Sequence, residues 1–205
     1  MTPDYWHDAA KLLGRRDPVL KKLVKACPEA NLRNRGNAFS TLARSITGQQ
    51  ISVKAAQSIW ERVAAATGKM TPQNILALDS DALRACGLSR AKVVYFKDLA
   101  AHFDDGRIRP RRWVHEDEET IIRELADVKG IGRWTAEMFL IFYLLRPNVL
   151  PVDDLGLQRA MERLYNDGDA LSIDEMRQIA KPWDPWCTVA TWYLWRSLDP
   201  IPVEY

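Results

Sequence analysis

Apolar residues recur at helical spacing along almost the whole chain, and this periodicity is the feature that most constrains its fold. Phe39, Leu42 and Ile46 fall at positions i, i+3 and i+7, which places them on one helical face. No clear run of alternating apolar residues with turn dipeptides is present, so a β-sheet is not expected. The pattern therefore predicts an all-α protein.

Helix start signals divide this pattern into segments. Three positions combine a capping side chain with an apolar helical pattern behind it: Ser52, Thr71-Pro72 and Ser89. Ser172 and Glu175 have the spacing of a capping box. A short helix is expected over 80–86, closed by Gly87.

The bulk composition limits the classes of function. With 205 residues the chain is long enough for one compact core or two small lobes. The formal net charge is +2 and the pI about 8.4, so a nucleic-acid surface must be a local patch, with a solvated basic face as the alternative. The acidic residues near the N-terminus argue against a signal peptide, and no window is apolar enough for a membrane span.

The three cysteines point away from a metal centre. Cys27, Cys86 and Cys187 are far apart and form no CxxC or Cys/His cluster. Neither zinc nor an iron–sulfur cluster is therefore expected. We expect reduced thiols in a cytoplasmic protein, nucleoid-associated if the source is bacterial.

Residues 125–160 contain the strongest functional signal. A Gly-Ile-Gly turn at 130–132 follows one helical run, and a second helix is expected from Arg133. Glycines at a helix start let backbone N–H groups approach a phosphate, and Lys129 and Arg133 add positive charge. The stretch favours sequence-independent binding of a DNA backbone. The alternative is an ordinary helix–turn–helix corner in which the glycines serve packing.

An acidic pair opens the next helix. Asp154 lies 22 residues after Gly132, and either Asp153 or Asp154 can cap a helix expected over 155–165. A capping carboxylate can also point into a cleft. The pair therefore supplies a candidate catalytic group for chemistry on bound DNA.

Together these stretches resemble the helix–hairpin–helix (HhH-GPD) DNA glycosylase superfamily, and most closely its DNA-3-methyladenine glycosylase II (AlkA-like) branch. Five motifs carry the resemblance in order: FSTLARSITGQQIS, CGLSRAKVVYFKDLA, VKGIGRWTAEMF, PVDDLGLQR and WDPWCTVATWYLW. They span about residues 37–197. The resemblance implies two helical lobes with a cleft between them, a terminal lobe of 1–35 plus 148–205 and a central lobe of 36–147 with the helix–hairpin–helix.

The resemblance also implies an activity. Members of this branch excise alkylated bases, such as 3-methyladenine and 7-methylguanine, from double-stranded DNA in base excision repair. The aspartate motif places the catalytic carboxylate on Asp154, beside Trp134 at the cleft mouth. Bifunctional members carry a nucleophilic lysine at the position of Trp134, so no Schiff base and no lyase activity are expected.

Aromatic residues are expected to line the pocket for the extruded base. Trp134 and Trp195 match pocket positions of the family, and their π-faces would attract a positively charged alkylpurine; the alternative is that both are core aromatics. The same resemblance assigns Phe39 and Met138 to the pocket. Met138 stands where some relatives have tyrosine, and Cys187 stands where the C-terminal motif usually has arginine.

Further residues are expected to contact the DNA or an ion. Gln50 matches the side chain that fills the gap left by the flipped base, with Ile51 as the alternative wedge. The expected DNA-binding residues of the hairpin are Lys129, Gly130, Gly132 and Arg133. No cofactor is required, although the family resemblance places a Na⁺ or K⁺ ion on the backbone carbonyls of Ala126, Val128 and Ile131.

Other functions remain open from the sequence. One is a glycosylase for deaminated or oxidised bases, and another is a non-catalytic module that binds DNA structures. A helical scaffold for protein interactions is the most distant alternative. We expect damaged double-stranded DNA as the partner, no membrane association, and a monomer.

Overall fold

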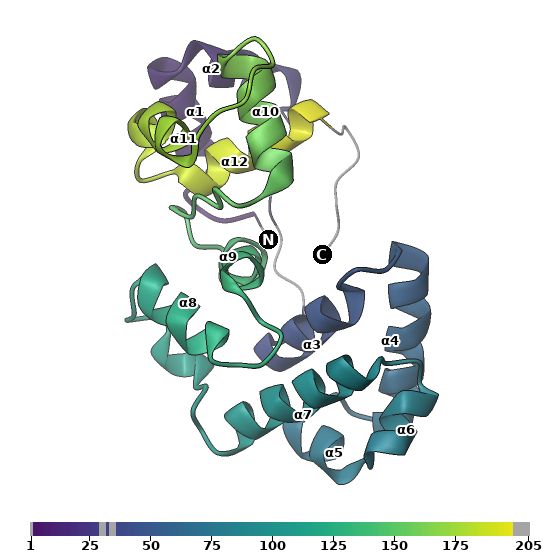
Figure 1. The fold of residues 1–205 in the computed structure, drawn as a ribbon. Helices are drawn as coiled ribbons and strands as arrows, with labels where there is room; N and C mark the ends of the chain where they lie inside the picture. The colour runs from purple at the N-terminus through teal and green to yellow at the C-terminus, as the bar shows by residue number, and fades with distance from the viewer. Residues whose placement is uncertain (1, 29–31, 33–35, 199–205) are drawn as a thin grey trace. The chain divides into compact units, whose positions relative to one another are not determined.

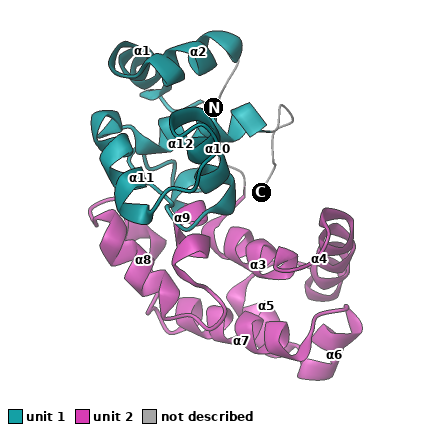
Figure 2. Ribbon diagram, turned by 45° about the horizontal axis from the view of Figure 1, so that its top comes forward, with its two compact units in different colours: residues 1–34, 140–205 teal, residues 35–139 magenta. Residues whose placement is uncertain are grey.

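The computed structural model describes residues 2–28, 32 and 36–198, and within them helices are the only regular elements (Figure 1). The expected all-α class is therefore confirmed. Each helix of this described part is too short or too polar to span a lipid bilayer. The chain divides into two compact units, one of residues 1–34 and 140–205 and the other of residues 35–139 (Figure 2). The domain bounds expected from the sequence stay a prediction.

The unit of residues 35–139 is built around one central helix. In chain order its helices are α3 (Ala38–Gly48), α4 (Val53–Thr67), α5 (Pro72–Ala77), α6 (Ser80–Ala85), α7 (Arg90–Asp104), the 3₁₀ turn η1 (Pro110–Arg112), α8 (Glu118–Ala126) and most of α9 (Arg133–Phe142). Helix α7 packs against α3, α5 and α6 and buries Val93, Phe96 and Leu99 among them. Helix α7 also contacts the turn between α8 and α9, where Asp98 accepts the Lys129 backbone N–H.

The second unit joins the two ends of the chain. It contains α1 (Trp6–Arg16), α2 (Pro18–Ala26), α10 (Leu155–Tyr165), α11 (Ile173–Ala180), the 3₁₀ turn η2 (Lys181–Trp183) and α12 (Cys187–Leu198). Helix α12 packs against α1, α2 and α10. Large aromatic side chains fill this core; Trp6 packs edge-on against Trp192 at a centroid distance of 5.6 Å, and Trp6 and Trp183 are fully buried.

Asp17 links three elements of this unit. Its Oδ1 accepts the backbone N–H groups of Val19 and Leu20 and so caps α2. Its Oδ2 accepts the Tyr165 hydroxyl at 2.8 Å and the Trp183 indole N–H at 2.9 Å. Every oxygen of this buried carboxylate therefore has donors, as a buried charge requires. Burial, with the Asp17 charge beside it, raises the pKa of Tyr165.

The predicted helix starts agree with the structure. Ser52, Thr71 and Ser89 are N-caps. Each hydroxyl accepts the backbone N–H of the residue three positions later in the chain. The capping box of Ser172 and Glu175 is complete. The short helix expected over 80–86 ends one residue earlier, at Ala85, before the turn at Gly87.

Candidate DNA-binding hairpin and catalytic carboxylate

Helices α8 and α9 form a helix–hairpin–helix with a turn over residues 127–132. The turn is closed by Val128 N–H donating to the Leu125 carbonyl and Ile131 N–H donating to the Val128 carbonyl at 3.0 Å. Val128 and Ile131 are buried and anchor the turn in the core. The Gly132 carbonyl accepts the Ala136 N–H, so the second helix begins immediately after the turn. The first N–H groups of such a helix lack intrahelical acceptors and favour an anion.

The two glycines of the turn have different roles. Gly130 has a φ of +83°, and a Cβ there would lie 2.2 Å from the Tyr95 ring. Gly132 is exposed, and a Cβ added to it would meet no heavy atom within 4 Å. Packing therefore requires glycine at 130, whereas at 132 the absent side chain leaves the backbone open to close approach from outside.

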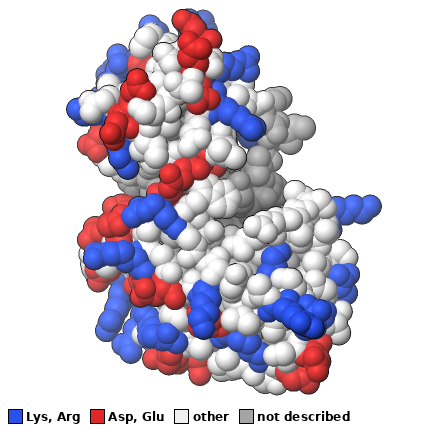
Figure 3. All heavy atoms as spheres, in the orientation of Figure 1, with Lys and Arg blue, Asp and Glu red and all other residues white. Residues whose placement is uncertain are grey.

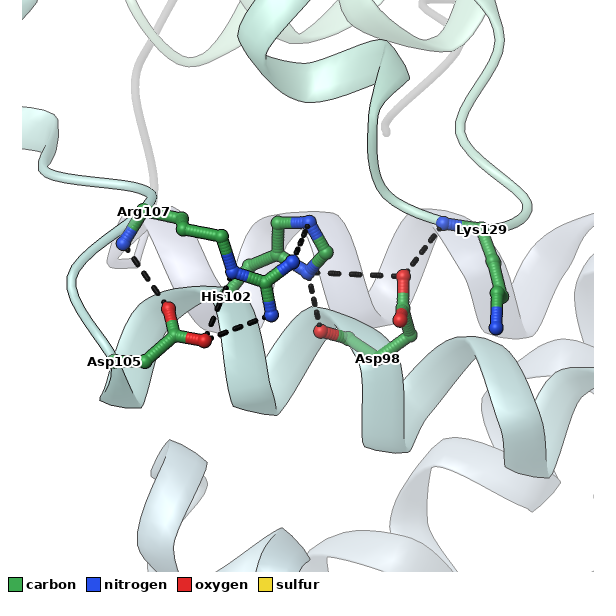
Figure 4. Close-up of polar contacts among 5 residues, drawn as sticks. All are labelled: Asp98, His102, Asp105, Arg107 and Lys129. Atoms are coloured by element: carbon green, nitrogen blue, oxygen red, sulfur yellow. Dashed lines mark hydrogen bonds and ion pairs between the residues drawn. The ribbon is translucent and has the colours of Figure 1, made fainter.

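Helix α7 supports the hairpin through a chain of polar contacts. The Lys129 backbone N–H donates to Asp98 Oδ2 at 2.8 Å (Figure 4). Asp98 also offers its carbonyl to Nδ1 of the buried His102 at 2.8 Å, and His102 Nε2 lies 2.8 Å from Arg107 Nη1. A carbonyl can only accept and a guanidinium can only donate, so in this arrangement Nδ1 donates to the Asp98 carbonyl and Nε2 accepts from Arg107. The Asp98 contact fixes the hairpin backbone at Lys129 but leaves the Lys129 side chain exposed.

Charge on this unit is mixed rather than uniformly basic. On the face drawn in Figure 3, Lys and Arg side chains are interspersed with Asp and Glu. Arg133, one of the expected DNA contacts, pairs with Glu119 at 2.5 Å, and this partner raises the pKa of Arg133. A phosphate at the start of α9 would therefore compete with Glu119 for the guanidinium, whereas the Lys129 side chain is exposed at the turn.

Asp154 caps α10 in the other unit. Its Oδ1 accepts the Leu157 backbone N–H at 2.7 Å and the Trp195 indole N–H at 2.8 Å. The sequence allowed either Asp153 or Asp154 as the N-cap of this helix, and the structure shows that it is Asp154. Trp195 stacks on Phe142 with ring centroids 5.7 Å apart and an interplanar angle of 11°. Two of the expected site residues, Asp154 and Trp195, are thus in direct contact.

Gly156 makes that contact feasible and was not singled out from the sequence. A Cβ at this position would lie 3.0 Å from Asp154 Oδ1 and 3.3 Å from the Trp195 ring. Glycine is a poor helix former, so its presence in a helical segment was the available signal. Phe142, the stacking partner of Trp195, was also missed because nothing in the sequence marks it.

The other expected pocket residues differ in exposure. Trp134 lies in the first turn of α9 with 36% of its surface exposed, which is not the burial of a core aromatic. Met138 and Phe39 are each only 4% exposed, and Phe39 packs edge-on against Phe103. Trp134, Met138 and Phe39 belong to one unit and Asp154 to the other. The pocket roles of these residues, and the expected neighbourhood of Asp154 and Trp134, stay predictions.

The loop after α3 presents the two expected wedge residues. Gln50 is exposed with a φ of +58°, a left-handed conformation uncommon for residues other than glycine. Ile51 follows and is 39% exposed. Both side chains are therefore available to a partner.

Two further features involve residues other than the expected pocket and wedge residues. Cys187 begins α12, is buried, and donates its backbone N–H to Asn148; burial raises the pKa of its thiol to about 12. A hollow of about 380 Å³ is lined by His102, Arg107, Glu124 and Asp127, none of which was an expected site residue.

Helices α8 and α9 with their glycine turn, followed by the helix that Asp154 caps, form a helix–hairpin–helix arrangement. Residues 43–185 match the family described as HhH-GPD superfamily base excision DNA repair protein, and the chain belongs to this family.

Two curated relatives and two solved structures show which members of the family are similar to this chain. The Bacillus subtilis (strain 168) relative YfjP is 31% identical over 171 residues, 80% of this chain, and the match spans 60% of YfjP. DNA-3-methyladenine glycosylase 1 of Schizosaccharomyces pombe is 32% identical over 88% of this chain and 82% of that protein. A solved structure of S. pombe Mag1 with abasic DNA has a TM-score of 0.77 and 32% identity, and the match covers 93% of this chain and 96% of that one. The crystal structure of a Bacillus halodurans DNA-3-methyladenine glycosidase has a TM-score of 0.87 and 33% identity, covering 97% of this chain and 92% of that one.

Proposed function

We propose that the chain is a monofunctional DNA glycosylase that hydrolyses the N-glycosidic bond of alkylated bases in double-stranded DNA, as a step of base excision repair. The observation that carries the proposal is the placement of Asp154 at the start of α10, with one oxygen held by Leu157 N–H and Trp195 N–H. The names of the S. pombe and B. halodurans relatives support 3-methyladenine as a substrate.

Asp154 would act on the sugar rather than on the base. Two donors fix one carboxylate oxygen, so the group is oriented before substrate binds. In that orientation the carboxylate would stabilise the positive charge that develops on the deoxyribose and orient or deprotonate the attacking water. An alkylated purine leaves readily because its departure neutralises its own charge, and little acid catalysis is needed.

The test of this function is base release from a panel of duplexes, each with one defined lesion, followed by mass spectrometry. We expect release of 3-methyladenine and 7-methylguanine. Release of only deaminated or oxidised bases would show that these are the substrates instead. DNA binding without release of any base would show that the protein is a non-catalytic module that binds DNA structures.

Trp134 is expected to recognise the charge of the lesion. We expect Trp134→Ala to slow release of 3-methyladenine about 10-fold, the value of a stacked or cation–π contact of roughly 1–2 kcal/mol. The uncharged hypoxanthine should be affected less. The measurement is single-turnover release of both bases, with Trp134→Phe as the variant that keeps an aromatic face. Equal losses for both bases would contradict a role in charge recognition.

Absence of lyase activity is part of the proposal. Trp134 has no amine, so the α9 start offers no Schiff-base nucleophile at the position used by bifunctional relatives. Borohydride trapping on abasic DNA is expected to yield no covalent complex. We also propose that the chain acts as a monomer in the cytoplasm, where its DNA substrate would lie.

A monovalent cation at the hairpin is also proposed. Ala126 ends α8, so its carbonyl lies at the negative end of that helix. The Val128 carbonyl accepts Ile131 N–H and keeps a second lone pair; with the Ile131 carbonyl these groups suit Na⁺ or K⁺. Replacing K⁺ by choline at constant ionic strength should weaken DNA binding several-fold, on the order of one lost charge-assisted contact. Unchanged binding would refute the cation.

A further inference from the structure

The loop that presents Gln50 is held at its base by three hydrogen bonds from two side chains. Lys92, from α7, donates through Nζ to the carbonyls of Thr47 at 2.8 Å and Gln49 at 2.7 Å. The Gln49 side chain donates through Nε2 to the Gly130 carbonyl at 2.8 Å. The residue just before Gln50 is therefore tied both to α7 and to the hairpin.

The left-handed backbone of Gln50 depends on such an anchorage. A residue other than glycine holds this conformation only where its surroundings impose it. Helix α3 ends at Gly48, and its last carbonyls lack intrahelical donors. An ammonium group satisfies these carbonyls and interacts favourably with the negative end of the helix. Lys92 therefore fixes the point from which Gln50 projects.

These contacts explain residues 87–92, Gly-Leu-Ser-Arg-Ala-Lys, which lie near the start of the motif CGLSRAKVVYFKDLA. Gly87 supplies a left-handed turn with a φ of +100°, and Leu88 is buried. Ser89 caps α7 by accepting the Lys92 N–H at 3.2 Å. Both the backbone and the ammonium of Lys92 are thus fixed. The motif builds a rigid support for the Gln50 loop.

The same side of α7 also holds the hairpin. Lys92, Tyr95 and Asp98 are three residues apart and so lie on one side of the helix. Tyr95 packs against Gly130. Asp98 accepts the Lys129 N–H, as Figure 4 shows. One stretch of α7 therefore fixes the Gln50 loop and the hairpin relative to each other within the same unit.

We propose that Lys92, acting with Gln49, is a positioning residue for base extrusion. It sets how far the Gln50 side chain extends into the DNA, relative to the hairpin that binds the DNA backbone. The inference rests on the proposed glycosylase function, because a gap-filling side chain is needed only where a base is flipped out. Lys92 itself would not touch the DNA. Its effect would be on the flipping step rather than on initial binding.

Helix α7 supplies a matched control. Lys97 donates through Nζ to the carbonyls of Ile75 at 2.9 Å, Leu76 at 3.0 Å and Leu78, at the end of α5. Burial lowers the pKa of both lysines. Lys92→Met and Lys97→Met therefore remove the same kind of contact from the same helix, but only the first touches the Gln50 loop.

The experiment uses a duplex with an abasic-site analogue opposite 2-aminopurine, whose fluorescence reports insertion beside the orphan base without any chemistry. We expect Lys92→Met to lose most of the fluorescence change of the wild type, with binding affinity retained and single-turnover excision slowed about 10- to 100-fold, the cost of a misplaced group. Lys97→Met should behave as the wild type in both assays. Lys92→Arg should restore part of the signal, and Gln49→Met should reproduce the loss if Lys92→Met does not fold.

Equal behaviour of Lys92→Met and Lys97→Met in the fluorescence assay would overturn the inference, as would a wild type that gives no fluorescence change. A wild type that gives the change but releases no base would refute the glycosylase function instead. In that case the comparison of the two lysine variants still decides the role of Lys92.

Discussion

Asp154→Asn is expected to lower base excision on the order of 10³-fold while DNA binding stays near that of the wild type. The reason is that a group oriented toward developing charge contributes factors of this size, and the amide carries no negative charge. Asparagine caps a helix as well as aspartate does. Its side-chain oxygen can accept from Leu157 N–H and Trp195 N–H as Asp154 Oδ1 does. The unfolding free energy should therefore change by less than about 1 kcal/mol.

The neighbouring carboxylate provides the control. Asp153 is exposed and does not cap α10, so Asp153→Asn removes the same charge one residue away. Its single-turnover excision rate and melting temperature should remain close to those of the wild type. Turnover on methylated duplex DNA by Asp154→Asn at the rate of Asp153→Asn would remove Asp154 from the catalytic role.

Much of the helical fold could be predicted because its signals are local. A serine or threonine cap and the apolar pattern behind it lie within one turn of each other, and Ser52, Thr71 and Ser89 cap the helices expected of them. The extent of α10, 155–165, could be read in the same way. The choice between Asp153 and Asp154 as its cap could not, because both residue types suit the position.

The contacts that hold the candidate site could not be predicted, because they join distant parts of the chain. Asp154 and Trp195 are separated by 41 residues, and their hydrogen bond depends on how α10 packs against α12. Lys92 donates to backbone carbonyls, and a carbonyl is the same for every residue type. A motif can therefore be recognised in a sequence while the reason for its lysine becomes visible only in the structure.

Gly130→Ala is expected to damage both stability and DNA binding. The added Cβ would lie 2.2 Å from the Tyr95 ring, and the φ of +83° disfavours any side chain. Overpacking and a left-handed alanine together should cost about 3 kcal/mol of unfolding free energy. Relief of the overlap would move the turn away from α7, so the Gln49 and Asp98 contacts to it would weaken. DNA binding should fall about 10-fold or more, since hydrogen bonds to a charged group are worth roughly 1.5–3 kcal/mol.

Gly132→Ala separates a loss of stability from a loss of DNA contact, because it changes the same turn without a steric overlap. No heavy atom lies within 4 Å of a Cβ at Gly132, so its melting temperature should stay close to that of the wild type. If Gly132 lets the backbone approach a phosphate, the added methyl group will weaken DNA binding without loss of stability. Thermal unfolding and DNA titration at two salt concentrations measure both effects. A stable Gly130→Ala variant with unchanged affinity would show that the hairpin does not grip the DNA, and Asp154 would then need another surface to bring its substrate to it.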